Sequence, residues 1–299
     1  MAILSSWLPT HRKVAIDLGT AYIRMAARDL GLLTISVGSL PRPPLRDGVV
    51  TDPYEVANIL RPLLGRAKRF GVGPNVAVGI PTDASSKERK ALHVAMCAAG
   101  AENIELVPEP QAAAFGAGLE AASPYAHMVV DIGEGVTDCA IIRGGRILHS
   151  QAVRIGCGTL REQVQDGYRR RWGIDLTWHE AERILEKVGV AGKSSSADSI
   201  CGPPSGDPSA EEHDNRPATI HAFVEPCIAE IIAVILEQLR DMPHELGCEV
   251  IDSGIMLTGG GALLPGMRER LCSATFINVT VPQHPLDVVV RGIQQMLDA

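Results

Sequence analysis

Two stretches of this chain share one design, in which an apolar strand ends at an aspartate, a glycine turn follows, and a second apolar strand leads away. The first stretch is Val14–Ile23, with Asp17 at the end of its strand, and the second is Met128–Ile142, with Asp131 in that place. Glycine turns between apolar strands predict β-hairpins. Turn glycines also let backbone amides approach an anion closely. One such hairpin is common for structural reasons alone, but a repeated one predicts two related halves that hold phosphates between their turns.

A third glycine cluster lies in Ser253–Met267, where a buried strand runs into Gly259–Gly261 and then into a helix start. The N-terminus of a helix is a natural anion site, because its backbone amides are free and its dipole favours negative charge. This segment therefore predicts a nucleotide contact.

The three motifs resemble the two phosphate loops and the adenosine loop of the actin and sugar-kinase superfamily. Within it, the chain is most similar to the bacterial MreB family, over most of its length and in the family's order. The segments that carry this closer resemblance are Pro43–Asp52, Val107–Leu119 and Val250–Met267. The resemblance implies an α/β, actin-like two-lobed fold with duplicated mixed-sheet subdomains. It also implies ATP and Mg²⁺ as cofactors and the chain itself as partner in a filament.

The resemblance also predicts the division of the chain. Lobe I is expected over 1–124, completed by 283–299, and lobe II over 125–282. MreB proteins carry a small subdomain between the strands near 30–39 and the Arg46–Gly48 loop, and here it is largely missing. A stretch rich in Ser, Pro, Gly and Asp predicts that the other small subdomain is reduced and flexible, over 189–220.

Periodicity and capping residues predict the main helices and strands. Pro243–Gly247 is expected to be a break. The expected helices are 52–70, 85–99, 111–118, 160–172, 178–188, 221–239 and 285–297, the last crossing back to lobe I, and the expected strands include 75–80, 104–107 and 277–281.

Composition narrows the function. The net charge of −7 argues against nucleic-acid binding. The seven cysteines have no metal-site spacing, so we expect free thiols and a cytoplasmic protein. There is no uninterrupted run of about 18 apolar residues, so no membrane span is expected. In Met1–Lys13 apolar residues precede cations, which fits a peripheral contact at the inner face of the membrane and fits a loosely packed terminus equally well.

Glu109 follows Pro108 at the start of a helix rich in small residues. A carboxylate there can simply interact with the helix dipole. The resemblance implies instead that Glu109 positions the water that attacks the γ-phosphate, with Asp131 as the second catalytic residue. It also implies that Asp17 and Asp131 hold Mg²⁺ through water. A slow ATPase activity is the corresponding expectation, left open at this stage.

The remaining site residues follow from the same resemblance. Glu134 stands where MreB has glycine, and Cys157 and Gly158 depart from the family's turn beside the ribose. Glu182 and Glu186 match nucleoside positions, although a solvated charged helix face explains them as well. The expected nucleotide-binding set is Asp17, Gly19, Thr20, Ala21, Tyr22, Gly133, Gly135, Val136, Thr137, Gly156, Cys157, Gly158, Glu182, Glu186, Gly259, Gly260, Gly261, Ala262 and Leu263.

The expected function is an actin-like cytoskeletal protein that binds ATP between two lobes and forms protofilaments. A non-polymerising scaffold or regulator derived from MreB, with weakened nucleotide binding, is the serious alternative. A small-molecule kinase of the same superfamily is disfavoured, because it needs a catalytic aspartate facing an acceptor pocket.

Overall fold

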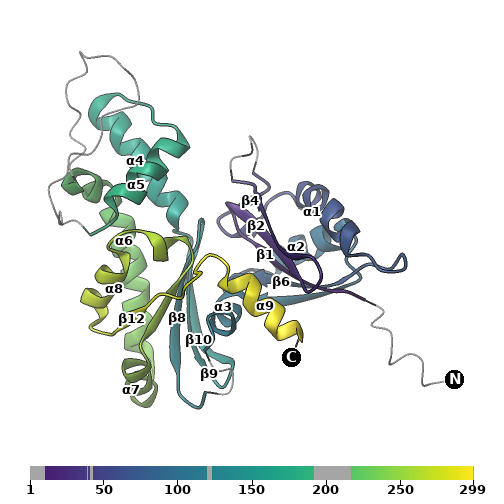
Figure 1. Ribbon diagram of the computed structural model, residues 1–299. Coiled ribbons are helices and arrows are strands. Elements are labelled where there is room, and N and C mark those ends of the chain that lie inside the picture. The colour runs from purple at the N-terminus through teal and green to yellow at the C-terminus, as the bar shows by residue number, and fades with distance from the viewer. Residues whose placement is uncertain (1–10, 39, 41–42, 120–122, 192–216, 299) are drawn as a thin grey trace.

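The computed structural model describes residues 11–38, 40, 43–119, 123–191 and 217–298. Two five-stranded mixed sheets form the two lobes (Figure 1). The first has the order β3-β2-β1-β6-β7, and the second repeats it as β10-β9-β8-β11-β12. In each sheet the first three strands of that order are antiparallel and the last three are parallel. The strands of the first sheet are β1 (Lys13–Leu18), β2 (Tyr22–Ala27), β3 (Gly31–Ser36), β6 (Asn75–Ile80) and β7 (Asn103–Pro108).

The second sheet has the same arrangement, which confirms the duplicated fold predicted from the repeated hairpin. Its strands are β8 (His127–Ile132), β9 (Thr137–Arg143), β10 (Arg146–Val153), β11 (Ile255–Thr258) and β12 (Val279–Thr280). Strand β10 was not predicted from the sequence.

Strand alternation turns both aspartates toward the space between the two lobes. Successive side chains on a strand point to opposite faces. Val14, Ile16 and Leu18 lie in the core of lobe I, whereas Ala15 lies in the core between the lobes. Asp17 therefore faces the other lobe. The same alternation on β8 turns Asp131 to that side, because Val129 contributes to the core between the lobes and Val130 to the core of lobe II.

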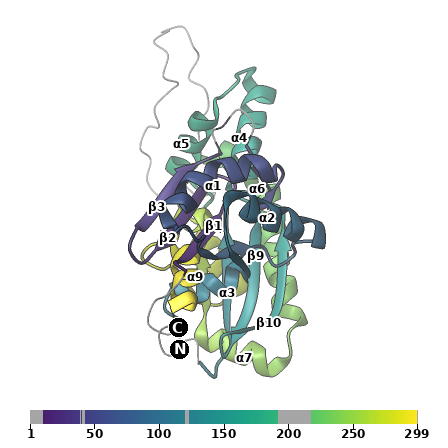
Figure 2. The same ribbon diagram turned by 90° about the vertical axis from the view of Figure 1, so that its right-hand side faces the viewer.

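Helices α1 (Pro53–Ala67) and α2 (Ser86–Ala99) cover the outer face of the first sheet (Figures 1 and 2). Asp52 caps α1, because its carboxylate accepts from the amides of Tyr54 and Glu55. Ser85 and Glu88 form a capping box on α2, and Gly100 ends it in the left-handed conformation. These boundaries agree with the sequence prediction to within a few residues.

Lobe II has a larger helical layer. It comprises α4 (Cys157–Trp172), α5 (Trp178–Val188), α6 (Pro217–Asp241), α7 (His244–Ser253), the 3₁₀ turn η1 (Gly260–Leu263) and α8 (Met267–Thr275). By length and composition, Ala218–Asp241 of α6 is apolar enough to cross a membrane. Its apolar side chains, including Val224, Ile228 and Ile231, belong to the core of lobe II, which accounts for that composition.

Helices α3 (Glu109–Gly116) and α9 (Val288–Asp298) form a layer between the two sheets (Figure 1). They approach closely at two glycines. A Cβ added at Gly116 would lie 1.8 Å from the Val288 carbonyl oxygen, and one added at Gly292 would lie 1.7 Å from that of Ala112. Helix α9 packs against β1 of the first sheet as well as against α3.

The first small subdomain is reduced to a hairpin of β4 (Leu45–Arg46) and β5 (Val49–Val50), as the sequence predicts. The break predicted at Pro243–Gly247 is wrong beyond its first residue. Pro243 is the N-cap of α7, because proline is tolerated where a helix starts and has no earlier turn to clash with. The N-terminal segment 1–10, and 192–216 of the predicted flexible segment, lie outside the described residues.

Candidate nucleotide-binding site

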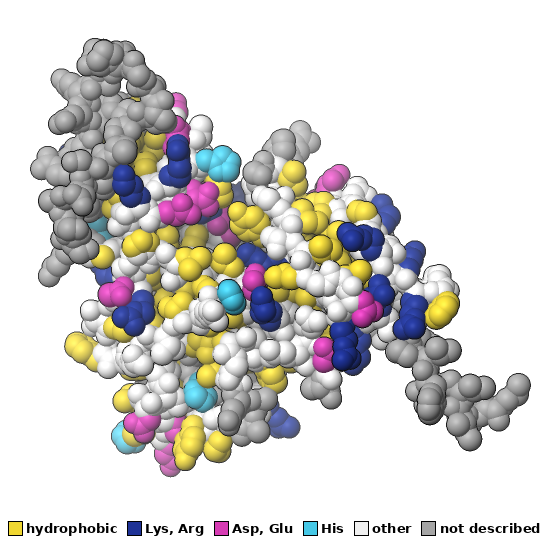
Figure 3. Space-filling view, viewed as in Figure 1, with side chains coloured by type: hydrophobic (Ala, Val, Ile, Leu, Met, Phe, Trp, Pro, Cys, Tyr) yellow, Lys and Arg dark blue, Asp and Glu magenta, His cyan; other side chains and the backbone are white. Residues whose placement is uncertain are grey.

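A cavity of about 270 Å³ lies between the lobes, bordered by both glycine hairpins. Lobe I contributes the turn of its hairpin and the start of α3. Lobe II contributes its own hairpin, helices α4 and α5, and the turn η1. Figure 3 shows this side of the molecule, with acidic side chains gathered beside the hollow between the lobes. Acidic residues outnumber basic ones in the lining, which includes Asp17, Glu109, Asp131, Glu134, Glu182 and Glu186 beside Arg24 and Arg161.

The first hairpin places a cation beside its aspartate. Asp17 and Arg24 are directly opposite on β1 and β2, and their side chains pair at 3.4 Å. Arg24 also lies 3.6 Å from Asp287, just before α9. Burial raises the pKa of Asp17, and Arg24 opposes that rise. In the turn, the Thr20 hydroxyl accepts from the Gly48 amide at 2.9 Å, which ties the β4–β5 hairpin to this loop.

The second hairpin has a different partner at the same register. Asp131 lies opposite Asp138, a second acid. Burial, then the charges of Asp17 and Asp138, raise the pKa of Asp131 to about 7. Gly259 has a positive φ of 78°, and a Cβ there would lie 2.3 Å from Asp131 Oδ1. Only glycine therefore allows the turn of lobe II to approach this carboxylate so closely.

Glu109 occupies the first turn of α3 and lines the cavity. Gly79 of β6 makes room for it, since a Cβ there would lie 3.2 Å from Glu109 Cγ. Burial, with the charges of Asp17, Asp131 and Asp138, raises its pKa well above the ordinary value. The raised pKa values show that negative charge on these carboxylates is disfavoured where they lie, and a bound cation would offset that penalty.

These carboxylates fit the Mg²⁺ contact implied by the sequence resemblance. Among the described residues no group of three His, Cys, Asp or Glu side chains could hold a metal ion directly. Mg²⁺ usually keeps several waters and binds through one or two carboxylates together with substrate phosphates. The arrangement of Asp17 and Asp131 suits that mode rather than an all-protein cage.

The far wall of the cavity is built by α4 and α5 around Arg161. This residue is 5% exposed, and its guanidinium pairs with Glu134 of the second hairpin and lies 3.8 Å from Glu182 of α5. The guanidinium also lies over the Trp178 ring, 4.2 Å from its centroid. Backbone bonds from Cys157 to Gly133 and from Gly158 to Glu134 fix the start of α4 against the hairpin.

The structure brings most of the predicted site residues together. Those that line the cavity are Asp17, Gly19, Thr20, Ala21, Tyr22, Glu109, Asp131, Gly133, Gly135, Val136, Cys157, Glu182, Glu186, Gly259, Gly260 and Leu263. Five lie outside the lining, namely Thr137, Gly156, Gly158, Gly261 and Ala262. The Thr137 hydroxyl is fully buried and donates to the Ile155 carbonyl, and Gly261 packs against Ile132, so these positions support the loops from behind.

Sequence reasoning missed the two lining arginines. Strand alternation could have found Arg24, since Ala26, two residues along β2, faces the core between the lobes. Arg161 gave no comparable signal, because its place depends on how α4 and α5 pack. Other lining residues that were not predicted are Leu18, Gly48, Glu134, Leu185, Leu264, Pro285, Leu286 and Val289.

Polar contacts also join the lobes beside the cavity. Arg154 of lobe II makes a two-pronged contact with Asp83 of lobe I, at 2.8 and 2.7 Å, and donates to the Asp47 carbonyl. The Thr82 amide and hydroxyl both donate to Asp138, each at 2.7 Å. These contacts tie the two lobes together beside the cavity.

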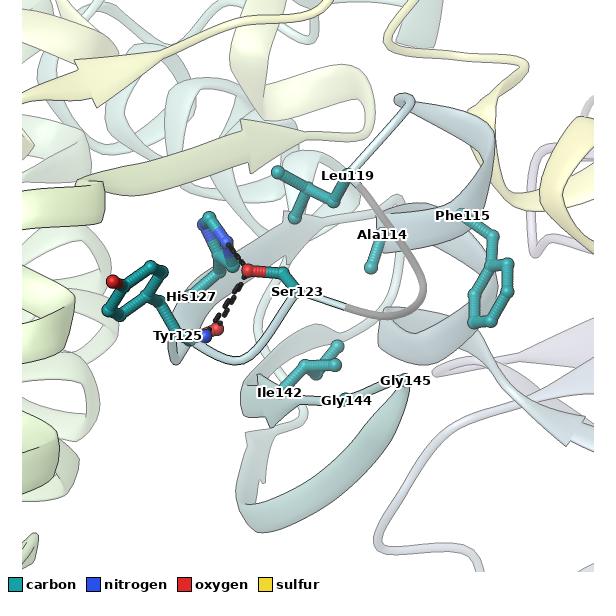
Figure 4. Close-up of a pocket in the computed structure, with 9 residues that line it drawn as sticks. All are labelled: Ala114, Phe115, Leu119, Ser123, Tyr125, His127, Ile142, Gly144 and Gly145. Carbon is teal, nitrogen blue, oxygen red and sulfur yellow. Dashed lines mark hydrogen bonds between the residues drawn. The ribbon is translucent and has the colours of Figure 1, made fainter.

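A second, much smaller pocket of about 10 Å³ lies away from this site, between α3 and the base of the second sheet (Figure 4). Its polar contact joins Ser123 Oγ to His127 Nε2 at 3.1 Å. Burial lowers the pKa of His127. The pocket is too small to hold a nucleotide.

Two lobes with the same sheet, joined by a helical layer and flanking a cavity between glycine hairpins, define an actin-like fold. Two solved structures share it. The crystal structure of MreB5 of Spiroplasma citri bound to ADP has a TM-score of 0.85 at 23% identity and covers 97% of both chains. The MamK double helical filament has a TM-score of 0.79 at 19% identity and covers 97% of this chain and 99% of that one.

The family model for MreB/Mbl protein matches residues 40–299. This chain belongs to the MreB/Mbl family, which confirms the resemblance drawn from the sequence. The cell shape-determining protein MreB of Escherichia coli (strain K12) is 32% identical over 260 residues, which cover 83% of this chain and 73% of that protein.

Proposed function

We propose that this protein is a cytoskeletal ATPase of the MreB type, which binds ATP and Mg²⁺ between its lobes and assembles into protofilaments. The observation that carries the proposal is the cavity in which both phosphate hairpins and Glu109 meet. Relatives support it: one structure of the same fold is bound to ADP, and another is a filament.

The residues have distinct roles in this proposal. The turn amides of Gly19–Ala21 and Gly133–Val136 bind the phosphates, and Leu263, Glu182 and Glu186 border the nucleoside. Asp17 and Asp131 orient the hydrated cation, which supplies charge neutralisation when it is bound. Glu109, at the N-terminus of α3, orients the water that attacks the γ-phosphate.

Assembly follows from the closure of the lobes. A nucleotide that touches both hairpins fixes their relative angle, and that angle sets how one subunit fits the next. Cytoplasmic assembly at the inner face of the membrane, with the N-terminal segment Met1–Lys13 as a peripheral contact, completes the proposal.

The first test is sedimentation of the pure protein with ATP, with ADP and without nucleotide, together with images of the pellets. We expect filaments with ATP, loss of nucleotide binding in Asp131→Ala, and normal binding with slowed phosphate release in Glu109→Gln. Pelleting under every condition would mean that assembly does not depend on nucleotide. Nucleotide binding with no sediment, at concentrations well above those at which the protein binds ATP, would contradict the filament.

The scaffold alternative rests on two observations. The second phosphate loop already holds a carboxylate, Glu134, and the first small subdomain that would cover the cleft is reduced to β4–β5. A protein that binds nucleotide weakly and never sediments would fit that alternative, whereas phosphate transfer to a sugar would identify a kinase.

A further inference from the structure

We propose that Arg161 is a phosphate-contacting residue that exchanges Glu134 for the phosphates of the bound nucleotide. The inference rests on the proposed nucleotide site and specifies how that site is charged. In the unliganded protein Glu134 holds the guanidinium. In the complex the guanidinium turns to the nucleotide and Glu134 moves aside.

Arg161 is built into the site rather than onto the surface. Its side chain is 6% exposed, lines the cavity and projects from α4 toward the second hairpin. Its Nε is buried and has no hydrogen-bond partner, so one donor of this charged group is unpaired in the described structure. A buried donor without a hydrogen-bond partner on a charged group costs free energy, and a ligand that accepts a hydrogen bond from it recovers that cost.

Glu134 occupies the place where phosphates are expected. The two hairpins have turns of equal length, because Asp17 pairs with Arg24 and Asp131 with Asp138. Counted from the aspartate, Glu134 is therefore the equivalent of Thr20 in the first turn. The first turn thus offers a hydroxyl where the second offers a carboxylate, 17% exposed and paired with Arg161.

Phosphate and carboxylate compete for the same partner. A guanidinium binds either anion through two parallel hydrogen bonds. The Arg161 guanidinium carbon lies 4.2 Å from the centroid of the Trp178 ring, and this contact does not depend on which anion the guanidinium binds. Phosphates that enter the turn repel the Glu134 carboxylate and attract the Arg161 guanidinium, and both effects favour the exchange.

The experiment is a double-mutant cycle on the full chain. Affinities for ATP, ADP and adenosine are measured by calorimetry for the wild type, Glu134→Gln, Arg161→Gln and the double variant. We expect Glu134→Gln to bind ATP about tenfold more tightly and adenosine unchanged, because it frees one charged donor group. Arg161→Gln alone should weaken ATP binding.

The decisive comparison is Arg161→Gln in the Glu134→Gln background. If Arg161 contacts phosphate, the double variant loses about tenfold or more in ATP affinity relative to Glu134→Gln, and adenosine binding is unaffected. If Arg161 only neutralises Glu134, replacing Arg161 in the Glu134→Gln background leaves the ATP affinity unchanged, and the proposal is overturned. Arg169→Gln is the matched control, since this arginine lies on the same helix and pairs with Asp166 and Asp175 outside the cavity.

Arg161→Lys protects the test against a folding defect. This substitution keeps the positive charge but removes the planar group that donates two parallel hydrogen bonds. In the Glu134→Gln background it should therefore weaken ATP binding by about fivefold. Unchanged ATP affinity in a folded Glu134→Gln, Arg161→Lys protein also overturns the proposal. Failure of the wild type to bind any of the three ligands would instead remove the proposed nucleotide site itself.

Discussion

The two glycine hairpins share length, topology and place beside the cavity, but they differ in charge at one pair of positions. In the first, Asp17 faces Arg24 across the strands, and in the second, Asp131 faces Asp138. The first hairpin thus has an internal counter-charge and the second has a like charge. Burial raises the pKa values of both Asp131 and Asp138 to about 7, and the charges of Asp17 and Asp138 add to the rise at Asp131. The second hairpin relies on other elements to balance it.

Those other elements belong to both lobes. Asp138 turns to Thr82 of lobe I, and Glu134 turns to Arg161 of α4. The first hairpin, by contrast, carries its own counter-charge, Arg24, which contacts both Asp17 and Asp287. Duplication therefore preserved the backbone, whereas the charges diverged so that one hairpin is self-contained and the other couples the lobes.

The largest expected effect comes from removing the counter-charge of the first hairpin. Arg24→Met leaves Asp17 without its counter-charge, and the side chains of Arg24 and Asp17 are each 11% exposed. Breaking a largely buried ion pair costs about 3 kcal/mol, because one charge remains buried without compensation. Urea denaturation of the variant and the wild type measures this loss in the free energy of unfolding. Arg12→Met, which loses a pair with the exposed Asp29, is the control and should cost under about 1 kcal/mol. Equal costs for the two variants would show that Asp17 is solvated.

Removing the like charge of the second hairpin should stabilise the folded protein rather than destabilise it. The raised pKa of Asp138 means that the folded protein holds a proton that the unfolded chain releases near pH 3.8. Stability is therefore lost as the pH rises from 3.8 to about 7. Asp138→Asn removes this loss and can still hydrogen-bond Thr82. We expect its melting temperature to exceed that of the wild type by about 2–4 °C at pH 8, the effect of about 1 kcal/mol.

The pH profile makes that test specific. The difference between Asp138→Asn and the wild type should shrink as the pH falls toward 4, where both side chains are neutral. A constant difference at every pH would mean that packing, not charge, explains the gain. Thr82→Val should destabilise most at high pH, since it removes the hydroxyl that donates to the carboxylate.

The sequence predicted those parts of the molecule that depend on local patterns. Helix Trp178–Val188 and strand Asn75–Ile80 were predicted residue for residue, because capping, periodicity and turn residues specify them. The glycine turns and their aspartates were also predicted. Helix α7 was missed because a proline marks a helix start as readily as an end.

The charge pattern of the site was not predictable in the same way. Arg161 pairs with Glu134, which is 27 residues away, and Arg154 with Asp83, which is 71 residues away. Such pairs depend on tertiary packing, which no local pattern reports. The family resemblance supplied the backbone motifs, but the arginines belong to this chain's own packing.

A third, smaller effect tests how the second hairpin couples the lobes. Arg154→Gln removes the contacts with Asp83 and leaves both lobes intact. We expect a larger radius of gyration in solution scattering and about fivefold weaker ATP binding, since a partly exposed ion pair contributes about 1 kcal/mol to closure. Arg143→Gln, whose partner Glu249 is in the same lobe, is the control. An unchanged radius of gyration would show that the Arg154–Asp83 contact does not hold the lobes together.

The smallest effect concerns the first turn, where Thr20 takes the place that Glu134 takes in the second. Thr20→Val removes the acceptor of the Gly48 amide, so the turn of the β4–β5 hairpin loses its tie to this loop. One such hydrogen bond contributes about 1 kcal/mol. Amide exchange at Gly48 should quicken, while the Thr82 amide, held by Asp138, keeps its protection. Thr20→Ser retains the hydroxyl and should behave as the wild type.

If exchange quickens equally at Gly48 and Thr82, the two hairpins are not separate units, and the division between a self-contained loop and a coupling loop fails. If only Gly48 responds, the β4–β5 hairpin is bound to the first loop by this single contact. The β4–β5 hairpin also packs closely against the second turn, since a Cβ at Gly135 would lie 2.6 Å from Asp47 Cα. In this chain the short β4–β5 hairpin then links the two cleft walls itself, through the Gly48 contact with the first turn and the Asp47 contact with the second.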